Sequence, residues 1–343
     1  MKLGIMGLAG SGRSTIFEAL TQNHGAESRK VEDRTASVKV PDLRVDDLAA
    51  LYQPSKITYA QVEYLLPAFT TGAERKEGAD VFNYVRNCDA LLHIVRNFSN
   101  NGSGPATPRE DFLKLERELI FSDFLAVDKR VERMNAERAK NKKIDEQELE
   151  LLTECRKVLE KDAPLRSRPE LAGAPKLRGY AFISAKPMLA LFNNDDSDTT
   201  APSLGDCFPS GPCEVVRGKL ERELAQMQAE GAAEFSREFG IEQSAMDRVI
   251  RSSHQLLGLI SFFTVGEDEV RAWTVKRNST AVDSAEAIHS DIKKGFIRAE
   301  IVSYDHLIRC GSEQEAKRKG LSRLEGKTYL VQDGDIICFR FNV

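Results

Sequence analysis

The feature that most constrains the fold is a glycine-rich segment near the start of the chain. It reads Gly-Leu-Ala-Gly-Ser-Gly-Arg-Ser over residues 7–14, after an apolar run at 2–6 and before a helical pattern at about 14–21. Glycines let backbone amides converge on phosphate oxygens, and the N-terminus of the following helix adds positive potential. The pattern departs from the usual phosphate loop at one position, because Arg13 stands where lysine is expected. We therefore expect an α/β fold that opens with a phosphate-binding loop.

The predicted phosphate contacts come from this loop and the first helical turn. Arg13 can neutralise phosphate charge, although its planar guanidinium follows a different path from a compact ammonium. Ser14 is the candidate ligand for magnesium, whose use the sequence leaves open. The predicted phosphate-binding residues are Gly7, Ala9, Gly10, Ser11, Gly12, Arg13, Ser14 and Thr15. The alternative is a turn that only packs the first strand against the first helix.

Apolar runs alternate with helical patterns through the first part of the chain. Strands are expected at 36–40, 60–66 and 89–98, with a helix at 80–86, and such alternation predicts a mostly parallel sheet. From Asp111 to Asp162 the chain holds neither glycine nor proline, and apolar residues recur at helical spacing on both sides of a lysine-rich tip. This pattern predicts a projecting helical hairpin.

Sheet character returns after the hairpin, and the final part changes again to short strands around one helix. The later strands are expected at 180–183, 188–192, 270–275, 297–303, 328–331 and 336–341, and the helices at 213–238, 243–256 and 283–293. Asp333-Gly334-Asp335 predicts a tight turn before the last strand. The expected division is a sheet domain at 1–110 and 171–258, a hairpin insert at 111–170 and a small α+β domain at 259–343.

Composition excludes several classes of protein. The chain has 343 residues, of which 41% are hydrophobic and 30% charged, and its formal net charge is -4. This balance excludes a disordered chain and argues against bulk coating of nucleic acid. No apolar stretch reaches the length of about 18 residues that a membrane span needs, and the six cysteines form no CxxC pair. A cytoplasmic monomer with no DNA or membrane partner is expected.

A second candidate motif is Asn-Asn-Asp-Asp at residues 193–196, at the end of an apolar run. In phosphate-loop GTPases an Asn-x-x-Asp segment in this place reads the base, because the aspartate accepts from two guanine donors that adenine lacks. Asn193 and Asp196 are therefore the candidate base-binding residues. The alternative is a solvent loop held by Asx turns. The nucleotide is left open between GTP and ATP.

The C-terminal third resembles the YchF/Obg-like ATPase family, a branch of the translation-factor-related P-loop GTPases. The resemblance rests on long ordered matches at 246–251, 256–259, 262–266, 269–274, 294–300, 333–335 and 339–343. It implies a C-terminal TGS domain with a ubiquitin-like β-grasp, and a coiled-coil insert for the hairpin. Pro41-Asp42-Leu43-Arg44 resembles the family's segment after the first switch. A nucleotide-binding protein associated with ribosomes or RNA is implied.

The chain departs from this family at the parts that hydrolyse nucleotide. Besides Arg13 for lysine, it has Leu66 and Phe69 where the family has Asp-x-x-Gly, and Lys30 at the first-switch threonine. Losing the lysine and the magnesium-holding aspartate should cost several kcal/mol of barrier, on the order of 10³-fold in rate. We expect at most a slow GTPase or ATPase. The alternative is a non-hydrolysing scaffold that binds a partner through the hairpin and the TGS domain.

Asp196 and a basic cluster at residues 317–319 bear on the choice of nucleotide and on the binding partner. The family's preference for ATP goes with Asn-x-x-Glu, so Asp196 moves this chain toward the guanine-reading arrangement. Lys317, Arg318 and Lys319 form a basic cluster in the TGS-like segment, which predicts contact with RNA phosphates. The alternative for the cluster is an ordinary solvated helix end.

Overall fold

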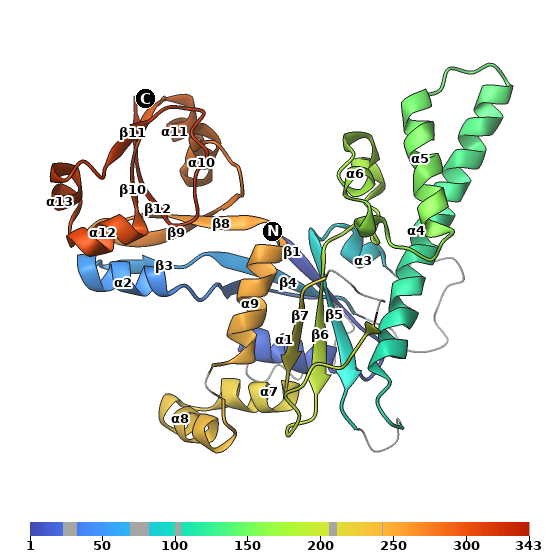
Figure 1. The fold of residues 1–343 in the computed structure, drawn as a ribbon, viewed down its shortest axis with the longest axis horizontal. Coiled ribbons are helices and arrows are strands. Elements are labelled where there is room, and N and C mark those ends of the chain that lie inside the picture. The colour runs from blue at the N-terminus through green and yellow to red at the C-terminus, as the bar shows by residue number, and fades with distance from the viewer. Residues whose placement is uncertain (23–32, 69–81, 100–103, 206–210, 242, 343) are drawn as a thin grey trace. The chain divides into compact units, whose positions relative to one another are not determined.

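The computed structural model describes residues 1–22, 33–68, 82–99, 104–205, 211–241 and 243–342 (Figure 1). Its contacts divide the chain into two compact units. The first unit contains residues 1–36 and 63–249, and the second contains residues 37–62 and 250–343. The sequence did not anticipate that residues 37–62 would belong with the C-terminal part. Among the described residues, no helix is long and apolar enough to cross a membrane.

A six-stranded sheet forms the centre of the first unit. Its strands are β1 (Lys2–Met6), β2 (Arg34–Lys39), β4 (Gln61–Leu66), β5 (Ala90–Asn97), β6 (Met188–Asn194) and β7 (Cys213–Val216). They lie in the order β2-β4-β1-β5-β6-β7, and β4, β1, β5, β6 and β7 run parallel to one another. The predicted α/β fold with a mostly parallel sheet is confirmed. Because these five strands are parallel, the loops that follow them meet at one edge of the sheet.

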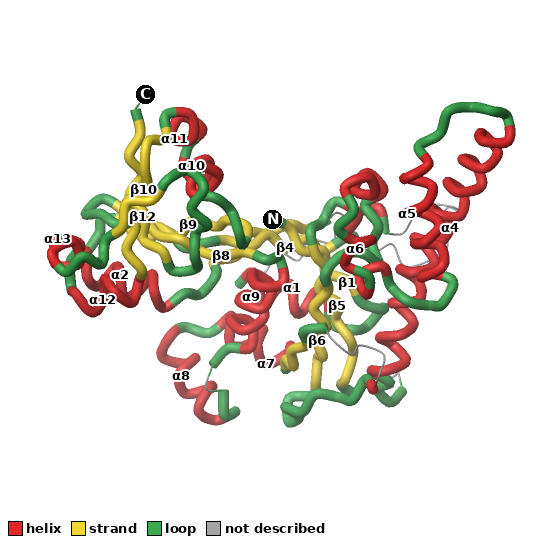
Figure 2. Tube along the Cα trace, turned by 45° about the horizontal axis from the view of Figure 1, so that its top comes forward, coloured by secondary structure: helices red, strands yellow, loops and turns green. Residues whose placement is uncertain are grey.

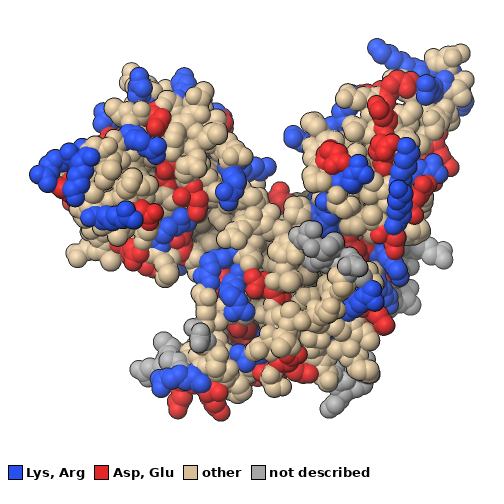
Figure 3. Space-filling model, in the orientation of Figure 1, with Lys and Arg blue, Asp and Glu red and all other residues tan. Residues whose placement is uncertain are grey.

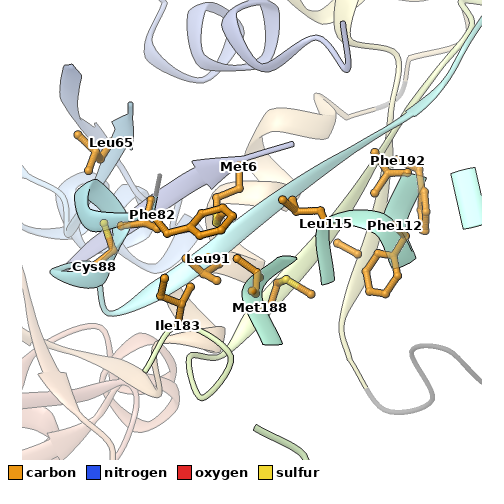
Figure 4. Close-up of a cluster of buried hydrophobic side chains, with 14 of the residues drawn as sticks. Met6, Leu65, Phe82, Cys88, Leu91, Phe112, Leu115, Ile183, Met188 and Phe192 are labelled. Atoms are coloured by element: carbon orange, nitrogen blue, oxygen red, sulfur yellow. The ribbon is translucent and has the colours of Figure 1, made fainter. Parts of the chain in front are cut away.

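Short helices and a buried apolar core complete this unit. The helices are α1 (Arg13–Thr21), α3 (Asn83–Arg86), α6 (Pro169–Ala172), α7 (Gly218–Gln226) and α8 (Ala229–Glu238), with 3-10 turns at Leu165–Ser167 and Pro175–Tyr180. Helix α9 (Ala245–Leu256) begins in this unit and ends in the second. Strand β6 is buried along its whole length, as expected for a central parallel strand whose residues are nearly all apolar. Figure 4 shows Met6, Leu91, Met188 and Phe192 in one cluster, with Phe112 from the next helix. This core fixes the ends of β1 and β6.

The expected helical hairpin is present as α4 (Pro108–Ala139) and α5 (Glu146–Leu159), and it extends away from the sheet (Figure 1). Helix α4 has Pro108 in its first turn, and the Asp145 side chain caps α5 by accepting from the Glu148 amide at 3.1 Å. At the base of the hairpin the Asp123 carboxylate accepts from the amides of Ile183 and Ser184 at 3.1 and 2.6 Å. The hairpin is thereby fastened to the loop that precedes β6.

The second unit is built on another sheet, which has six strands; β8, β9, β10 and β12 are labelled in Figure 2. Its strands are β3 (Lys56–Thr58), β8 (Leu259–Thr264), β9 (Glu269–Lys276), β10 (Phe296–Ser303), β11 (Arg323–Glu325) and β12 (Asp335–Phe341). They lie in the order β11-β10-β12-β8-β9-β3. The helices are α2 (Leu43–Tyr52), α10 (Ala281–Ile288), α11 (Ser290–Lys294), α12 (Tyr304–Cys310) and α13 (Glu313–Arg318). Gly334 has φ 92° in the turn before β12, as the Asp-Gly-Asp pattern predicted.

Four predicted elements were wrong in extent or type. Residues 180–183 are not a strand, because the Ile183 amide donates its hydrogen bond to the Asp123 carboxylate and not to a neighbouring strand. Residues 328–331 make only an isolated bridge, from Leu330 to Thr280. The predicted helix at 213–238 begins with strand β7, which pairs with β6. The predicted helix at 283–293 is two helices, since the extended His289 ends one and caps the next by accepting from the Asp291 amide.

Candidate nucleotide-binding site

The glycine-rich segment forms a tight loop between β1 and α1, and two of its glycines have no room for a side chain. A Cβ on Gly7 would lie 2.5 Å from both the Ile94 carbonyl oxygen and the Ser11 Oγ. Gly12 has φ 92°, and a Cβ there would lie 2.3 Å from the Asn193 Nδ2. Gly7 therefore requires glycine because neighbouring atoms lie too close for a side chain. Gly12 requires it for the same reason and because its backbone is left-handed.

The helix start beside the loop is suited to an anion. The first intrahelical hydrogen bond of α1 is donated by the Ile16 amide to the Gly12 carbonyl at 2.9 Å. The amides before Ile16 thus precede the helical hydrogen-bond ladder, and the first turn contains no acidic side chain. The Ser11 Oγ is buried and has no hydrogen-bond partner within the described part of the chain. The chemistry of this orphaned hydroxyl and of the glycine cradle fits a phosphate group, and the predicted phosphate contacts stay a prediction.

The Asn193 side chain, at the end of β6, braces the phosphate loop through hydrogen bonds. Its side chain is buried, its Nδ2 donates to the Ser11 carbonyl at 3.1 Å, and its Oδ1 accepts from the Gly218 amide at 3.0 Å. One side chain therefore joins the phosphate loop to the first residue of α7. Asp196, the other candidate base-reading residue, is more open, and its Oδ2 lies 3.4 Å from the Lys219 Nζ.

A pocket of about 400 Å³ opens beside the loop and brings these candidate residues together. It is lined by Gly12, Thr15, Phe98, Ser99, Asn193, Asn194, Asp195, Asp196, Lys219 and Arg222. They lie at or after the carboxyl ends of β1, β5, β6 and β7, which is where open parallel sheets bind ligands. Of the predicted site residues, its lining includes Gly12 and Thr15 from the phosphate side and Asn193 and Asp196 from the base side, but not the other predicted phosphate residues.

Phe98 is a wall of this pocket that the sequence analysis missed. The segment carrying it is tied to the candidate base loop, because the Asn97 Nδ2 donates to the Asn194 Oδ1 at 2.9 Å and the Ser99 amide donates to the Asp195 Oδ2 at 3.1 Å. An aromatic ring in this place gives a nucleobase a stacking surface. Its only sequence signal was an aromatic residue directly after the apolar run of β5.

The structure describes three of the residues at the expected hydrolytic and magnesium positions, namely Arg13, Ser14 and Leu66. Leu66, at the end of β4, is 6% exposed and offers no oxygen to magnesium. Arg13 is partly buried, and this burial lowers the pKa of its guanidinium. Among the described residues no group of three or more His, Cys, Asp or Glu side chains is arranged to hold a metal ion. Ser14 is exposed at the start of α1 and remains the candidate magnesium ligand, whereas Lys30 and Phe69 lie outside the described residues.

The predicted basic cluster lies at the end of α13 in the second unit, and its cations are engaged by carboxylates. Lys317 pairs with Glu300 at 2.7 Å, while Arg318 and Lys319 pair with Glu315 at 2.8 and 3.3 Å. Lys and Arg side chains are interspersed with Asp and Glu over the face in Figure 3. The cluster is therefore exposed, and each of its three cations is paired with a carboxylate.

The strand order, the loop after β1 and the asparagine brace at the end of β6 define a phosphate-loop protein of the GTPase class. Matches to known proteins narrow this class. Residues 259–342 match the YchF-GTPase_C family, described as a protein of unknown function (DUF933). The chain is 36% identical to the ribosome-binding ATPase YchF of Bacillus subtilis over 99% of both chains, and 34% identical to that of Escherichia coli O157:H7 over 100% of this chain and 99% of the other.

Solved structures agree with these matches. The structure of the Schizosaccharomyces pombe YchF GTPase superposes with a TM-score of 0.83 at 26% identity, over 99% of this chain and 97% of that one. A GTP-binding protein from Pyrococcus horikoshii shares the fold, with a TM-score of 0.57 at 18% identity over 100% of both chains. The chain belongs to the YchF family, as its sequence resemblance indicated.

Replacing Asn193 by alanine is expected to loosen the phosphate loop. The change leaves the Ser11 carbonyl and the Gly218 amide without their partner, which should cost about 2–3 kcal/mol of stability. Thermal unfolding measures this cost, and nucleotide titration should show at least about tenfold weaker binding. Asn83→Ala, at an exposed position of α3, is the matched control. Unchanged stability of Asn193→Ala would contradict the bracing role.

Proposed function

We propose that this protein binds GTP or ATP at the loop of residues 7–14, associates with ribosomes or RNA, and hydrolyses its nucleotide slowly or not at all. The observation that carries the proposal is the glycine cradle, which is braced by Asn193 and lies beside a pocket that both candidate base residues line. Gly7 to Thr15 would hold the phosphates, and Asn193, Asp196 and Phe98 would surround the base. The phosphate-loop domain at 1–110 and 171–258 would thus carry the ligand.

Weak hydrolysis is supported by two side chains, Arg13 in the phosphate loop and Leu66 at the end of β4. Phosphoryl transfer relies on positioning and on neutralising the charge of the transferred group. Magnesium, when bound, supplies part of that neutralisation, and Ser14 is the residue proposed to hold it. A buried leucine at position 66 cannot orient water around such an ion. The same two departures, Arg13 and Leu66, favour the second candidate, a scaffold that holds a partner without any turnover.

The choice of base is proposed from Asp196. A carboxylate one carbon shorter than the family's glutamate favours guanine, but the exposed Asp196 also pairs with Lys219. We therefore keep both GTP and ATP, and competition between them in one titration decides the preference. Preference for GTP should be reduced in Asp196→Glu if the carboxylate reads the base. Lys176→Ala, which alters an exposed ion pair in the hairpin region, serves as a control.

Association with ribosomes is proposed from the relatives, since those of B. subtilis and E. coli are named ribosome-binding ATPases. The TGS-like domain at 259–343 would contact RNA through Lys317, Arg318 and Lys319, and the hairpin insert at 111–170 would provide a second arm. The protein is proposed to act as a cytoplasmic monomer.

Replacing Lys317, Arg318 and Lys319 together by alanine should lower the affinity for ribosomes. It should also make that affinity less dependent on salt concentration. Each phosphate contact with single-stranded RNA contributes about 0.7 to the slope of log affinity against log salt, so the slope should fall by about 2. Cosedimentation with ribosomes over a salt series measures it. The control replaces Arg298, Lys293 and Lys294, three other cations of the same unit. Equal slopes for the cluster variant and the wild type would exclude the cluster as the RNA contact.

A further inference from the structure

Two motifs that the nucleotide site does not use meet in the second unit. They are Pro41-Asp42-Leu43-Arg44 and the turn Asp333-Gly334-Asp335. The Arg44 guanidinium pairs with the Asp42 carboxylate at 2.8 Å and with the Asp333 carboxylate at 3.0 Å. It also lies 5.1 Å from the centre of the Phe263 ring. A Cβ on Gly334 would lie 3.1 Å from the Arg44 Nη1, so the glycine of the turn leaves room for the guanidinium.

Both carboxylates around Arg44 are themselves fixed by the backbone. Asp42 caps α2 by accepting from the Arg44 amide at 3.0 Å, and Asp333 accepts from the Ser261 amide of β8 at 2.9 Å. The Arg44 side chain is only 26% exposed. A planar guanidinium held between two positioned carboxylates fixes direction as well as charge, and a lysine would not reproduce this. We call this arrangement the Arg44 clamp.

The remainder of the segment is bonded to the same unit along its length. Strand β3 pairs in parallel with β9, and the Ser55 amide donates to the Glu267 carbonyl at 2.9 Å. The Tyr52 hydroxyl lies 3.2 Å from a Glu313 carboxylate oxygen, and the Thr58 hydroxyl donates to Glu269 at 2.7 Å. Residues 41–59 are therefore built into the second unit, which is made mostly of residues from 250 onward.

The same segment connects the two strands that lead to the nucleotide site. Strand β2 precedes it and β4 follows it, and these strands are neighbours in the first sheet. At their far ends the Asp33 carboxylate accepts from the Ala68 amide at 2.9 Å. The end of β4 at Leu66 lies at the same sheet edge as the end of β1, which carries the phosphate loop. The β2–β4 ribbon thus has one end at the edge of the proposed nucleotide site, and its other end is joined by the chain to residues 41–59, which contain the Arg44 clamp.

We propose that the Arg44 clamp couples the nucleotide site to the C-terminal unit through the β2–β4 ribbon. The clamp orders residues 41–59, and through them the ribbon whose other end lies at the sheet edge that carries the phosphate loop. Nucleotide binding at the loop and ordering of the clamp are then linked by a coupling free energy. Because such coupling is reciprocal, each event favours the other. This regulatory inference rests on the proposed nucleotide binding, and its test includes a readout that does not need nucleotide.

The test uses the full chain with Arg44→Ala and compares amide hydrogen exchange without nucleotide. Faster exchange is expected in α2, next to the lost contact, and also in β2 and β4, which Arg44 does not touch. Asp333→Asn should have the same effect, because it removes the charge while keeping an acceptor for the Ser261 amide. Lys294→Ala, which removes an exposed ion pair with Asp291 in the same unit, is the control. A change confined to α2 overturns the proposal.

Titration with GTP and ATP supplies the second readout. A coupling at the lower end of the usual range predicts about fivefold weaker nucleotide binding by Arg44→Ala than by the wild type. Affinity within a factor of two of the wild type overturns the coupling. Absence of nucleotide binding by the wild type would instead count against the proposed function, and the exchange comparison in β2 and β4 would still decide the coupling.

Discussion

Gly12→Ala is expected to raise the dissociation constant for GTP and ATP by at least about 100-fold, or about 2.7 kcal/mol. The added methyl would lie 2.3 Å from the Asn193 Nδ2, on a backbone with φ 92°. Both the asparagine brace and the loop must then shift, which moves the amides that are to hold phosphate. Calorimetric titration of the purified variant measures the effect.

Gly179→Ala is the matched control for this substitution. It adds the same methyl in the same unit, at a position where a Cβ would meet nothing within 4 Å. The control should bind nucleotide as the wild type does and unfold at the same temperature. Nucleotide affinity of Gly12→Ala equal to that of Gly179→Ala would mean that the ligand does not bind at this loop.

Nucleotide turnover by the wild type is expected to be on the order of 10³-fold below that of a family member with the loop lysine and the Asp-x-x-Gly motif. The chain lacks the compact ammonium at position 13 and an oxygen at position 66, both of which act on charge at the transferred phosphate. Release of inorganic phosphate under saturating nucleotide, with the two proteins assayed together, measures the difference.

Arg13→Lys with Leu66→Asp is expected to recover about tenfold or more of this turnover. Recovery should be incomplete, because Lys30 and Phe69 remain changed. Arg13→Gln with Leu66→Asn, which has similar shapes but lacks both charges, is the control, and circular dichroism verifies that each variant folds. Wild-type turnover equal to that of the unaltered family member would refute the assigned loss of hydrolysis.

Much of the first sheet could be predicted because its signals are local. The apolar runs of β1, β5 and β6 and the glycine chemistry between β1 and α1 need no distant partner to be read. Strand β3 could not be predicted in this way, because its three residues become a strand by pairing with β9, more than two hundred positions along the chain. The apolar stretch before β6 looked like a strand, but its amides bond to the Asp123 side chain of α4.

The candidate site was predicted in outline from residue chemistry. The loop glycines could be recognised from the sequence because only glycine tolerates such close approaches and positive φ angles. The structure shows why glycine is required at Gly7 and Gly12. Asn193 was singled out as a base-reading residue, whereas its observed bonds go to the Ser11 carbonyl and the Gly218 amide. Phe98 was missed, since only the meeting of β5 and β6 at one sheet edge brings it to the pocket.

The measurement that tests the account most directly is calorimetric titration of the full chain with GTP and with ATP, each with and without magnesium. The account predicts saturable binding of at least one of the two nucleotides at a single site, lost in Gly12→Ala and kept in Gly179→Ala. No heat of binding for either nucleotide at millimolar concentration would contradict it.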